Sequence, residues 1–228
     1  MTGAVATNRF GEGPLSRAAA LIYSLLVVEL LFLVASVPGL VPLFLLRSDV
    51  SNLPLVAACA IPVGPALAAA LYALRQHRAD LTDLRPAAAF WRGYRMNLRG
   101  VLAVWVPLLA WLTVIGVSLA NLGAAGVPGW WGVLLVLIAV WAALWGANAL
   151  VITALFAFRV RDVARLAGYF LARTPGVTLG AACLLIVSIG VTVLASELVL
   201  ALLGSVFTLA LLRTYRPMID VLRNEFTK

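Results

Sequence analysis

The chain has 228 residues, of which 64% are hydrophobic and 11% charged, and its formal net charge is +8. Soluble domains average about 45–50% apolar and about 25% charged residues. A water-soluble fold of this size could not bury so much apolar surface, which excludes an ordinary soluble domain. The composition predicts an all-α, polytopic membrane helix bundle that forms a single integral membrane domain over residues 1–228.

The positive charge has a simple interpretation, because almost all of the arginines lie at the ends of apolar runs. Basic residues beside membrane spans mark the cytoplasmic side and contact lipid headgroups. The sequence contains no RNA-reading motif, and His77 with the two cysteines, Cys59 and Cys183, cannot build a zinc finger. We therefore expect membrane lipids as partners, and we expect no nucleic acid, no metal and no cofactor.

The first two candidate spans cover residues 18–46 and 53–74, each long enough for the roughly 20 apolar residues that a helical span needs. Pro38 is expected to bend the first span. Three residues of the second span predict a helix kink: Pro62, Gly64 and Pro65. A proline inside a span frees a backbone carbonyl that neighbouring helices must satisfy, so this segment is expected to pack against protein rather than lipid.

Residues 75–100 are too charged to span a membrane, and from Pro86 they fit an amphipathic helix over about residues 86–98. At about 100° per residue, the arginines fall in one stripe and the aromatic and apolar residues in another. The first stripe consists of Arg85, Arg92, Arg95 and Arg99, and the second of Ala87, Phe90, Trp91, Tyr94 and Leu98. Such a helix can lie in the cytoplasmic interface, and it would equally suit docking on a partner.

The C-terminal half predicts four further spans, over about residues 101–122, 131–158, 176–195 and 197–212. Residues 176–212 are divided in two because this apolar run exceeds the roughly 17–25 residues of a single span. Six spans place both termini and 16 of the 17 Lys and Arg residues on the cytoplasmic side, with only Arg47 on the other. Five spans would move the basic tail across the membrane, so six are favoured.

Glu29 is the only acid deep inside a predicted span. A charged carboxylate at the middle of a membrane costs about 2.5–3.5 kcal/mol on insertion scales, so such residues usually have a use. One interpretation is a proton site or a partner-binding site. The other is a protonated or hydrogen-bonded carboxyl group that faces the interior of the bundle.

Trp141, Trp145 and Asn148 share one face of the fourth span, at spacings of four and three residues. Aromatic rings can stack on sugars and an amide can bind hydroxyl groups, so a sugar-facing pocket is one hypothesis. Ordinary packing between helices or against lipid is the more common use of such a face, and it is favoured here.

Catalytic motifs are missing from the sequence, which has no HExxH, no GxSxG and no phosphate-binding GxxxxGK. His77 lies beside Arg75 and Arg78 and lacks a partner that would activate a nucleophile. We therefore expect that the protein is not an enzyme.

Several short motifs lie in the N-terminal half of the chain. They are Phe10–Leu15 with Arg17, Ala35–Pro38, Gly64-Pro65 ahead of Ala70–Tyr72 and Leu74-Arg75, and the aromatic-basic stretch Phe90–Asn97. In these motifs, over roughly residues 10–110, the chain resembles the YesL-like family of bacterial multi-pass membrane proteins, whose domain is of unknown function. Where that family often has an asparagine in its first span, this chain has Glu29.

The resemblance implies an accessory role beside carbohydrate ABC importers in the bacterial cytoplasmic (inner) membrane. Our leading hypothesis is a non-catalytic accessory or scaffolding subunit that binds the permease subunits of such an importer. Arg92, Arg95 and Arg99 would then meet acidic residues or lipid phosphates, and Trp91 and Tyr94 would anchor the contact. The alternative is a small solute transporter that acts on its own as a homo-oligomer, with Glu29 and the Trp141 face along its path.

Overall fold

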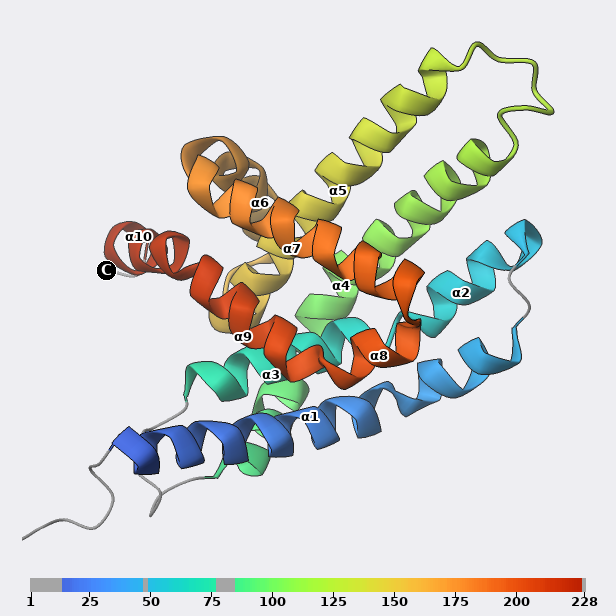
Figure 1. Ribbon diagram of the computed structural model, residues 1–228. Coiled ribbons are helices and arrows are strands. Elements are labelled where there is room, and N and C mark those ends of the chain that lie inside the picture. The colour runs from blue at the N-terminus through green and yellow to red at the C-terminus, as the bar shows by residue number, and fades with distance from the viewer. Residues whose placement is uncertain (1–13, 47–48, 77–84, 227–228) are drawn as a thin grey trace, which may run out of the picture.

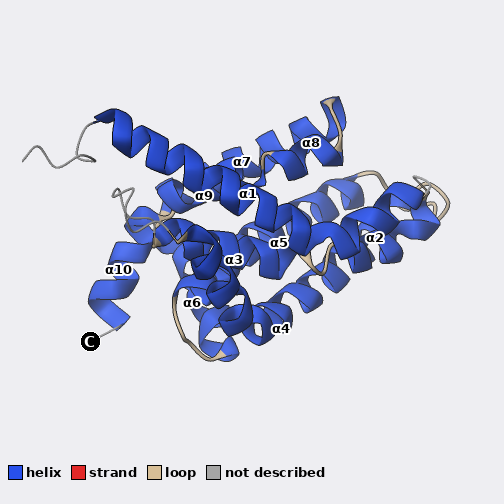
Figure 2. Cartoon of the chain, turned by 90° about the horizontal axis from the view of Figure 1, so that it is seen from below, coloured by secondary structure: helices blue, strands red, loops and turns tan. Residues whose placement is uncertain are grey.

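The structure is a computed structural model, and it describes residues 14–46, 49–76 and 85–226. Regular structure in this part of the chain is entirely helical (Figures 1 and 2). The elements are α1 (Pro14–Leu45), the short 3-10 helix η1 (Val50–Asn52), α2 (Leu53–Cys59), α3 (Val63–Arg75), α4 (Pro86–Ala120), α5 (Trp130–Leu155), α6 (Val160–Arg173), α7 (Pro175–Leu194), α8 (Glu197–Leu202), α9 (Gly204–Thr214) and α10 (Arg216–Phe226).

Five of these stretches are long and apolar enough to cross a membrane: α1, η1 to α3, α4, α5 and α7. The chain is therefore a multi-pass membrane protein, and the predicted all-α class is confirmed. Arg47, His77 and Arg78, and the motif residues Phe10–Gly13, lie outside the described residues. In Figure 1, α1, α3 and α9 run side by side, while α4 and α5 form an antiparallel hairpin that leans away from them.

The second span is broken rather than kinked, because a turn at residues 60–62 separates α2 from α3. Gly64 and Pro65 lie inside the first turn of α3, so the break precedes them. The indole N–H of Trp105 donates a 3.0 Å hydrogen bond to the carbonyl of Ala60 at the break. The same carbonyl also accepts a 3.2 Å hydrogen bond from the N–H of Val63, so Trp105 adds a second donor from a neighbouring helix. The helix after the break, α3, packs against protein, as expected, with nine buried residues in thirteen.

The predicted interfacial helix and the predicted third span form one continuous helix, α4, which corrects the expectation of two separate elements. Only Gly100 interrupts good helix formers between Leu98 and Val101, and one glycine costs about 1 kcal/mol, too little to end a helix. Two tertiary contacts hold this part of α4. Gly93 packs against the Tyr72 ring, and the Asn97 amide donates a 3.1 Å hydrogen bond to the carbonyl of Ala154.

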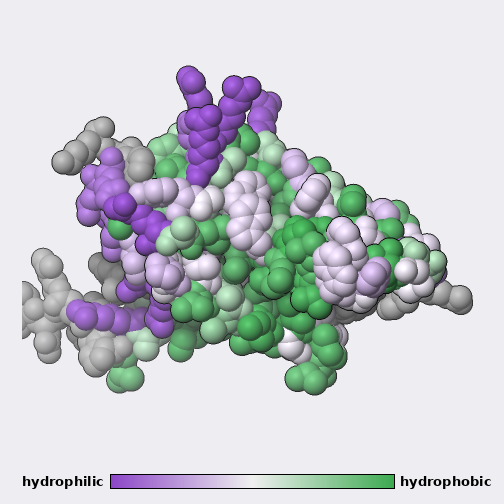
Figure 3. All heavy atoms as spheres, turned by 90° about the horizontal axis from the view of Figure 1, so that it is seen from above, coloured by the Kyte–Doolittle hydropathy of each residue, from purple (hydrophilic) through white to green (hydrophobic). Residues whose placement is uncertain are grey.

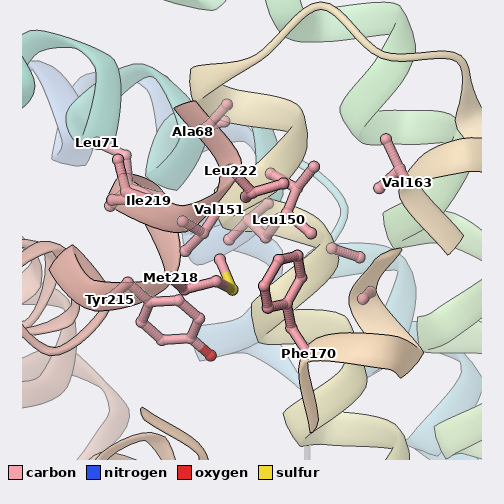
Figure 4. Packing of buried hydrophobic residues seen from close by; sticks show 14 of the residues in the cluster. Ala68, Leu71, Leu150, Val151, Val163, Phe170, Tyr215, Met218, Ile219 and Leu222 are labelled. Carbon is pink, nitrogen blue, oxygen red and sulfur yellow. The ribbon is translucent and has the colours of Figure 1, made fainter. Parts of the chain in front are cut away.

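The separate amphipathic helices of the structure are α6 and α10, in segments that the sequence indicated only as basic. On α6 the buried residues Val163, Ala167 and Phe170 follow the helical repeat, and on α10 the same is true of Met218, Ile219 and Leu222. Figure 4 shows these faces meeting around Leu150 and Val151 of α5. An ion pair of 3.3 Å between Arg173 and Glu225 joins the exposed sides of the two helices.

The predicted sixth span is divided into α8 and α9, which turn back along α7 (Figure 1). The break falls at Leu203-Gly204. A Cβ atom on Gly204 would lie 2.6 Å from the ring of Phe32, so α1 packs directly against the break. Neither piece is long enough by itself to cross a bilayer, since eleven residues of α9 extend about 16 Å.

Candidate functional site

The first turns of α4 carry the predicted contact surface. Trp91 is 39% exposed, and Arg92, Arg95 and Arg99 are also exposed. A shallow hollow in this surface is lined by Ala88, Trp91, Arg92, Arg95 and Met96. Hydrophilic side chains gather over one part of the molecule in Figure 3, while apolar residues cover most of the rest of that view. The arrangement presents two guanidinium groups beside an indole ring, which suits carboxylate or phosphate groups.

Phe90 does not belong to this surface, which corrects its predicted role in a partner or lipid contact. Its side chain is fully buried in a cluster with Val28, Phe32 and Leu74. The ring also lies 5.9 Å from that of Trp91, in an edge-to-face arrangement. Phe90 therefore supports Trp91 from behind, because a large apolar ring gains more from the junction of α1, α3 and α4 than from the surface.

Tyr94 and Leu98 are half-buried on the same helix. The Tyr94 ring lies 5.6 Å from that of Trp91 and packs against the cluster that contains Phe90. Of the predicted contact residues, Trp91 and the three arginines are thus the most accessible. Tyr94 and Leu98 are only partly accessible.

Glu29 accepts a 2.6 Å hydrogen bond from the backbone N–H of Ser205, in the first turn of α9. Helix N-termini have unsatisfied N–H groups and a partial positive charge, so they favour a carboxylate. The second carboxylate oxygen, Oε1, is buried and has no hydrogen-bond partner among the described residues. This geometry matches the interpretation of a hydrogen-bonded carboxyl group that faces the bundle, and it joins α1 to α9.

The predicted sugar-facing residues are not gathered into a pocket. Trp141 is 59% exposed on the outside of α5. The indole N–H of Trp145 donates a 3.1 Å hydrogen bond to the carbonyl of Ala164, and the Asn148 amide donates one of 3.0 Å to the carbonyl of Ala167. The two side chains fasten α5 to α6, so the packing interpretation describes them better than sugar binding.

Tyr215 is a site residue that the sequence did not indicate. Its side chain is fully buried, and its hydroxyl donates a 2.7 Å hydrogen bond to Oδ1 of Asn148. Burial raises the pKa of the Tyr215 phenol above its ordinary value. The only signal in the sequence was an aromatic residue between two arginines in a basic tail, and nothing there pointed to α5.

An apolar chamber of about 500 Å³ lies among the spanning helices. Its walls come from α1, α2, α3, α4, α5, α7, α8 and α9, and they include Phe32, Leu40, Leu43, Leu108, Leu184 and Phe207. Most of the polar side chains that the structure describes in its walls are already engaged. Ser188 and Thr208 donate to carbonyls of their own helices, and Trp105 donates to Ala60. The Ser36 hydroxyl is buried and has no hydrogen-bond partner among the described residues.

Metal chemistry finds no support in the described part of the chain, which contains no group of three or more His, Cys, Asp or Glu residues that could hold an ion. Cys59 and Cys183 are free thiols there.

Comparison with known proteins gives one match. Residues 25–119 match the model of a family described as "Protein of unknown function, DUF624". The match relates the segment 25–119 to that family. YesL-like proteins belong to this family, so the resemblance seen in the sequence is confirmed. No curated protein and no solved structure shows significant similarity to the chain.

The matched segment covers most of α1 and continues through α4 to Gly116–Leu119, so it contains both Glu29 and the exposed surface around Trp91. The partners of these residues lie partly outside it. Ser205, which donates to Glu29, and Ala154, which accepts from Asn97, both belong to the C-terminal half. The matched segment and the remaining helices therefore form one packed unit.

Proposed function

We propose that the protein is a non-catalytic accessory subunit of the bacterial cytoplasmic membrane, which binds the permease subunits of a carbohydrate ABC importer and supports sugar uptake. The match of residues 25–119 to the DUF624 family supports this proposal through the YesL-like resemblance. The single structural observation that carries it is the exposed surface of Trp91, Arg92 and Arg95 on α4.

The chemistry of this surface suits a protein partner. The planar guanidinium group of arginine forms paired hydrogen bonds with carboxylates, and tryptophan supplies a large apolar contact. Buried Phe90 holds the indole in place from behind, which reduces the conformational entropy lost on binding. Acidic side chains at the cytoplasmic ends of permease helices are the expected counterpart.

The proposed topology has six crossings and cytoplasmic termini. The pair α8 and α9 would supply the sixth crossing as a broken helix that returns beside α7. α1 begins and α10 ends toward the same end of the molecule in both ribbon views (Figures 1 and 2). The basic residues of α6 and α10 then lie on the cytoplasmic side, as the preference for positive charge there requires.

The chamber argues in the same direction. A transport path for sugars needs polar groups that replace the water around the hydroxyl groups, and an unpaired buried polar group costs about 1–3 kcal/mol. Among the hydroxyl and indole groups in the described walls of the chamber, only the Ser36 hydroxyl has no partner, and one hydroxyl cannot replace the water around a sugar. A scaffolding role needs no such path.

The test is co-purification from the native membrane in a mild detergent, followed by mass spectrometry. We expect permease and nucleotide-binding subunits in a fixed ratio with the wild-type chain. With the double variant Arg92→Glu/Arg95→Glu, the amount of permease recovered should fall at least tenfold. Arg161→Glu/Arg165→Glu, on the exposed side of α6, is the matched control and should retain it. Equal recovery with both double variants would remove α4 as the contact surface.

A solute transporter that acts alone as a homo-oligomer is the second candidate, and one observation favours it. Glu29 is an acidic residue inside a span that contacts the N-terminus of α9, a piece of a broken helix. Transporter sites are often built at the ends of such discontinuous helices. Proteoliposomes that hold this chain alone and accumulate solute would establish this candidate and discard the accessory role.

A further inference from the structure

The apolar chamber has a shape that a single slender molecule would fill. On α1, its wall extends from Phe32 to Leu43. Eleven helical positions correspond to about 16 Å, which is about half of the roughly 30 Å hydrocarbon layer of a bilayer. A second stretch of the wall follows α8 and α9 from Leu200 to Leu211. The chamber is therefore about as long as one leaflet is deep.

The volume limits what can enter. The chamber offers about 500 Å³, within the range of small-ligand pockets. A single hydrocarbon chain is a molecule of the size that such a pocket holds.

The chemistry of the walls excludes polar occupants. Leucine, alanine, valine and phenylalanine side chains make up most of the lining. Of the hydroxyl and indole groups among the described lining residues, only the buried hydroxyl of Ser36 lacks a partner. A sugar or a charged metabolite would lose its hydration without compensation. An apolar chain loses nothing, because it leaves one hydrocarbon environment for another.

The chamber also lies where a lipid could reach it. In Figure 1 the α4–α5 hairpin, the α7–α8 turn and the α1–α2 turn diverge at the end of the molecule away from the C-terminus. The wall residues Leu43, Val56, Leu112 and Leu200 come from these diverging segments. The helices there are apolar on the outside as well, so the surrounding medium is lipid rather than water.

We propose that the chamber holds one hydrocarbon chain of a membrane lipid, taken from the leaflet opposite the basic end of the molecule. The bound chain connects the α1–α2 segment to the α7–α8 segment. The site is independent of the surface on α4, so it can exist whether or not the protein binds an importer.

The first test uses the full chain purified in a mild detergent and washed extensively. Native mass spectrometry should show about one retained phospholipid per chain. Two variants that fill the chamber from different walls, Ala143→Phe and Ala201→Phe, should each reduce that retention at least fivefold. Ala110→Phe, at an exposed position of α4, is the matched control and should keep the lipid.

The second test uses Trp105 as a reporter, since its ring lines the chamber. The chain is placed in phosphatidylcholine vesicles with brominated acyl chains, and the fluorescence of Trp105 is obtained as the difference between wild type and Trp105→Phe. We expect the bromine atoms to quench this signal. In a chamber-filling variant whose elution volume and melting temperature equal those of the wild type, the quenching should fall at least twofold.

Two results would overturn the proposal. One is the absence of retained lipid together with quenching that the chamber-filling variants leave unchanged. The other is a dimer that these variants dissociate while Ala110→Phe does not, because a second copy would then occupy the chamber.

Discussion

The hydroxyl of Tyr215 donates a 2.7 Å hydrogen bond to Oδ1 of Asn148, and the Asn148 amide donates in turn to the carbonyl of Ala167. One buried asparagine thus connects the start of α10, the middle of α6 and the C-terminal third of α5. Because all three groups are withdrawn from water, each is satisfied only if the three helices meet. This connection fixes how the two amphipathic helices sit on the spanning helices.

Removing either partner of this bond should destabilise the fold, and the two effects should not add. We expect Tyr215→Phe to cost about 1 kcal/mol, and Asn148→Ala to cost about 2 kcal/mol because it also leaves Ala167 without its donor. Unfolding by SDS in mixed micelles measures both. A double-mutant cycle should give a coupling of about 1 kcal/mol between the two positions. Strictly additive effects would mean that the bond contributes nothing.

Stability should also depend on alkaline pH through Tyr215. Burial raises the pKa of this phenol in the folded chain above the ordinary value of 10.0 that it has when unfolded. The unfolded chain therefore loses its proton first as the pH rises, which favours unfolding. We expect the contribution of Tyr215 to be complete below about pH 10 and to be lost progressively above it. In Tyr215→Phe this part of the alkaline loss of stability should disappear.

Glu29 should be replaceable by an amide more easily than by an apolar residue. Glu29→Gln keeps an oxygen that can accept the N–H of Ser205, so the contact between α1 and α9 should survive with a loss below about 1 kcal/mol. Glu29→Leu leaves that N–H buried and unpaired, and should cost about 1–3 kcal/mol. Unfolding measurements on both variants test this order. A Gln variant as unstable as the Leu variant would show that the charge, and not the hydrogen bond, supports the N-terminus of α9.

Two glycines should respond oppositely to the same substitution. A Cβ atom at Gly93 would lie 2.8 Å from the Cβ and the ring of Tyr72, whereas one at Gly190 meets nothing within 4 Å. Gly93→Ala should therefore destabilise the α3–α4 contact by about 1–3 kcal/mol. Gly190→Ala, inside α7, should be neutral or stabilise by up to about 1 kcal/mol through helix propensity. Thermal unfolding of the two variants, compared in the same detergent, provides the measurement.

Several features of the fold were predictable from local sequence. Long apolar runs located the spans, since each residue has a transfer free energy into lipid that depends little on its neighbours. Pro62 and Pro65 likewise indicated the interruption of the second span, because a missing N–H acts wherever the helix lies. The motifs of the N-terminal half indicated the YesL-like resemblance, and the match of residues 25–119 to the DUF624 family confirms it.

Hydropathy could not separate the residues that face protein from those that face lipid. In a bilayer both faces of a helix are apolar, so the periodicity that marks a buried face in a soluble protein is weak. For this reason the sequence predicts a surface position for Phe90, which is buried. It also predicts one shared face for Trp141 and Trp145, although Trp141 is exposed and Trp145 is hydrogen-bonded within the bundle. Only the tertiary contacts distinguished these residues.

By itself, the sequence determined that this protein is helical, has several spans of a multi-pass membrane protein and is similar over residues 25–119 to a known family. The tertiary structure decided how Glu29 meets Ser205, how Asn148 meets Tyr215, and that an apolar chamber remains between the spans. The reason is physical. Insertion depends on the summed hydropathy of each segment, whereas pairing between distant polar groups and the packing of small residues depends on helices that are far apart in the chain.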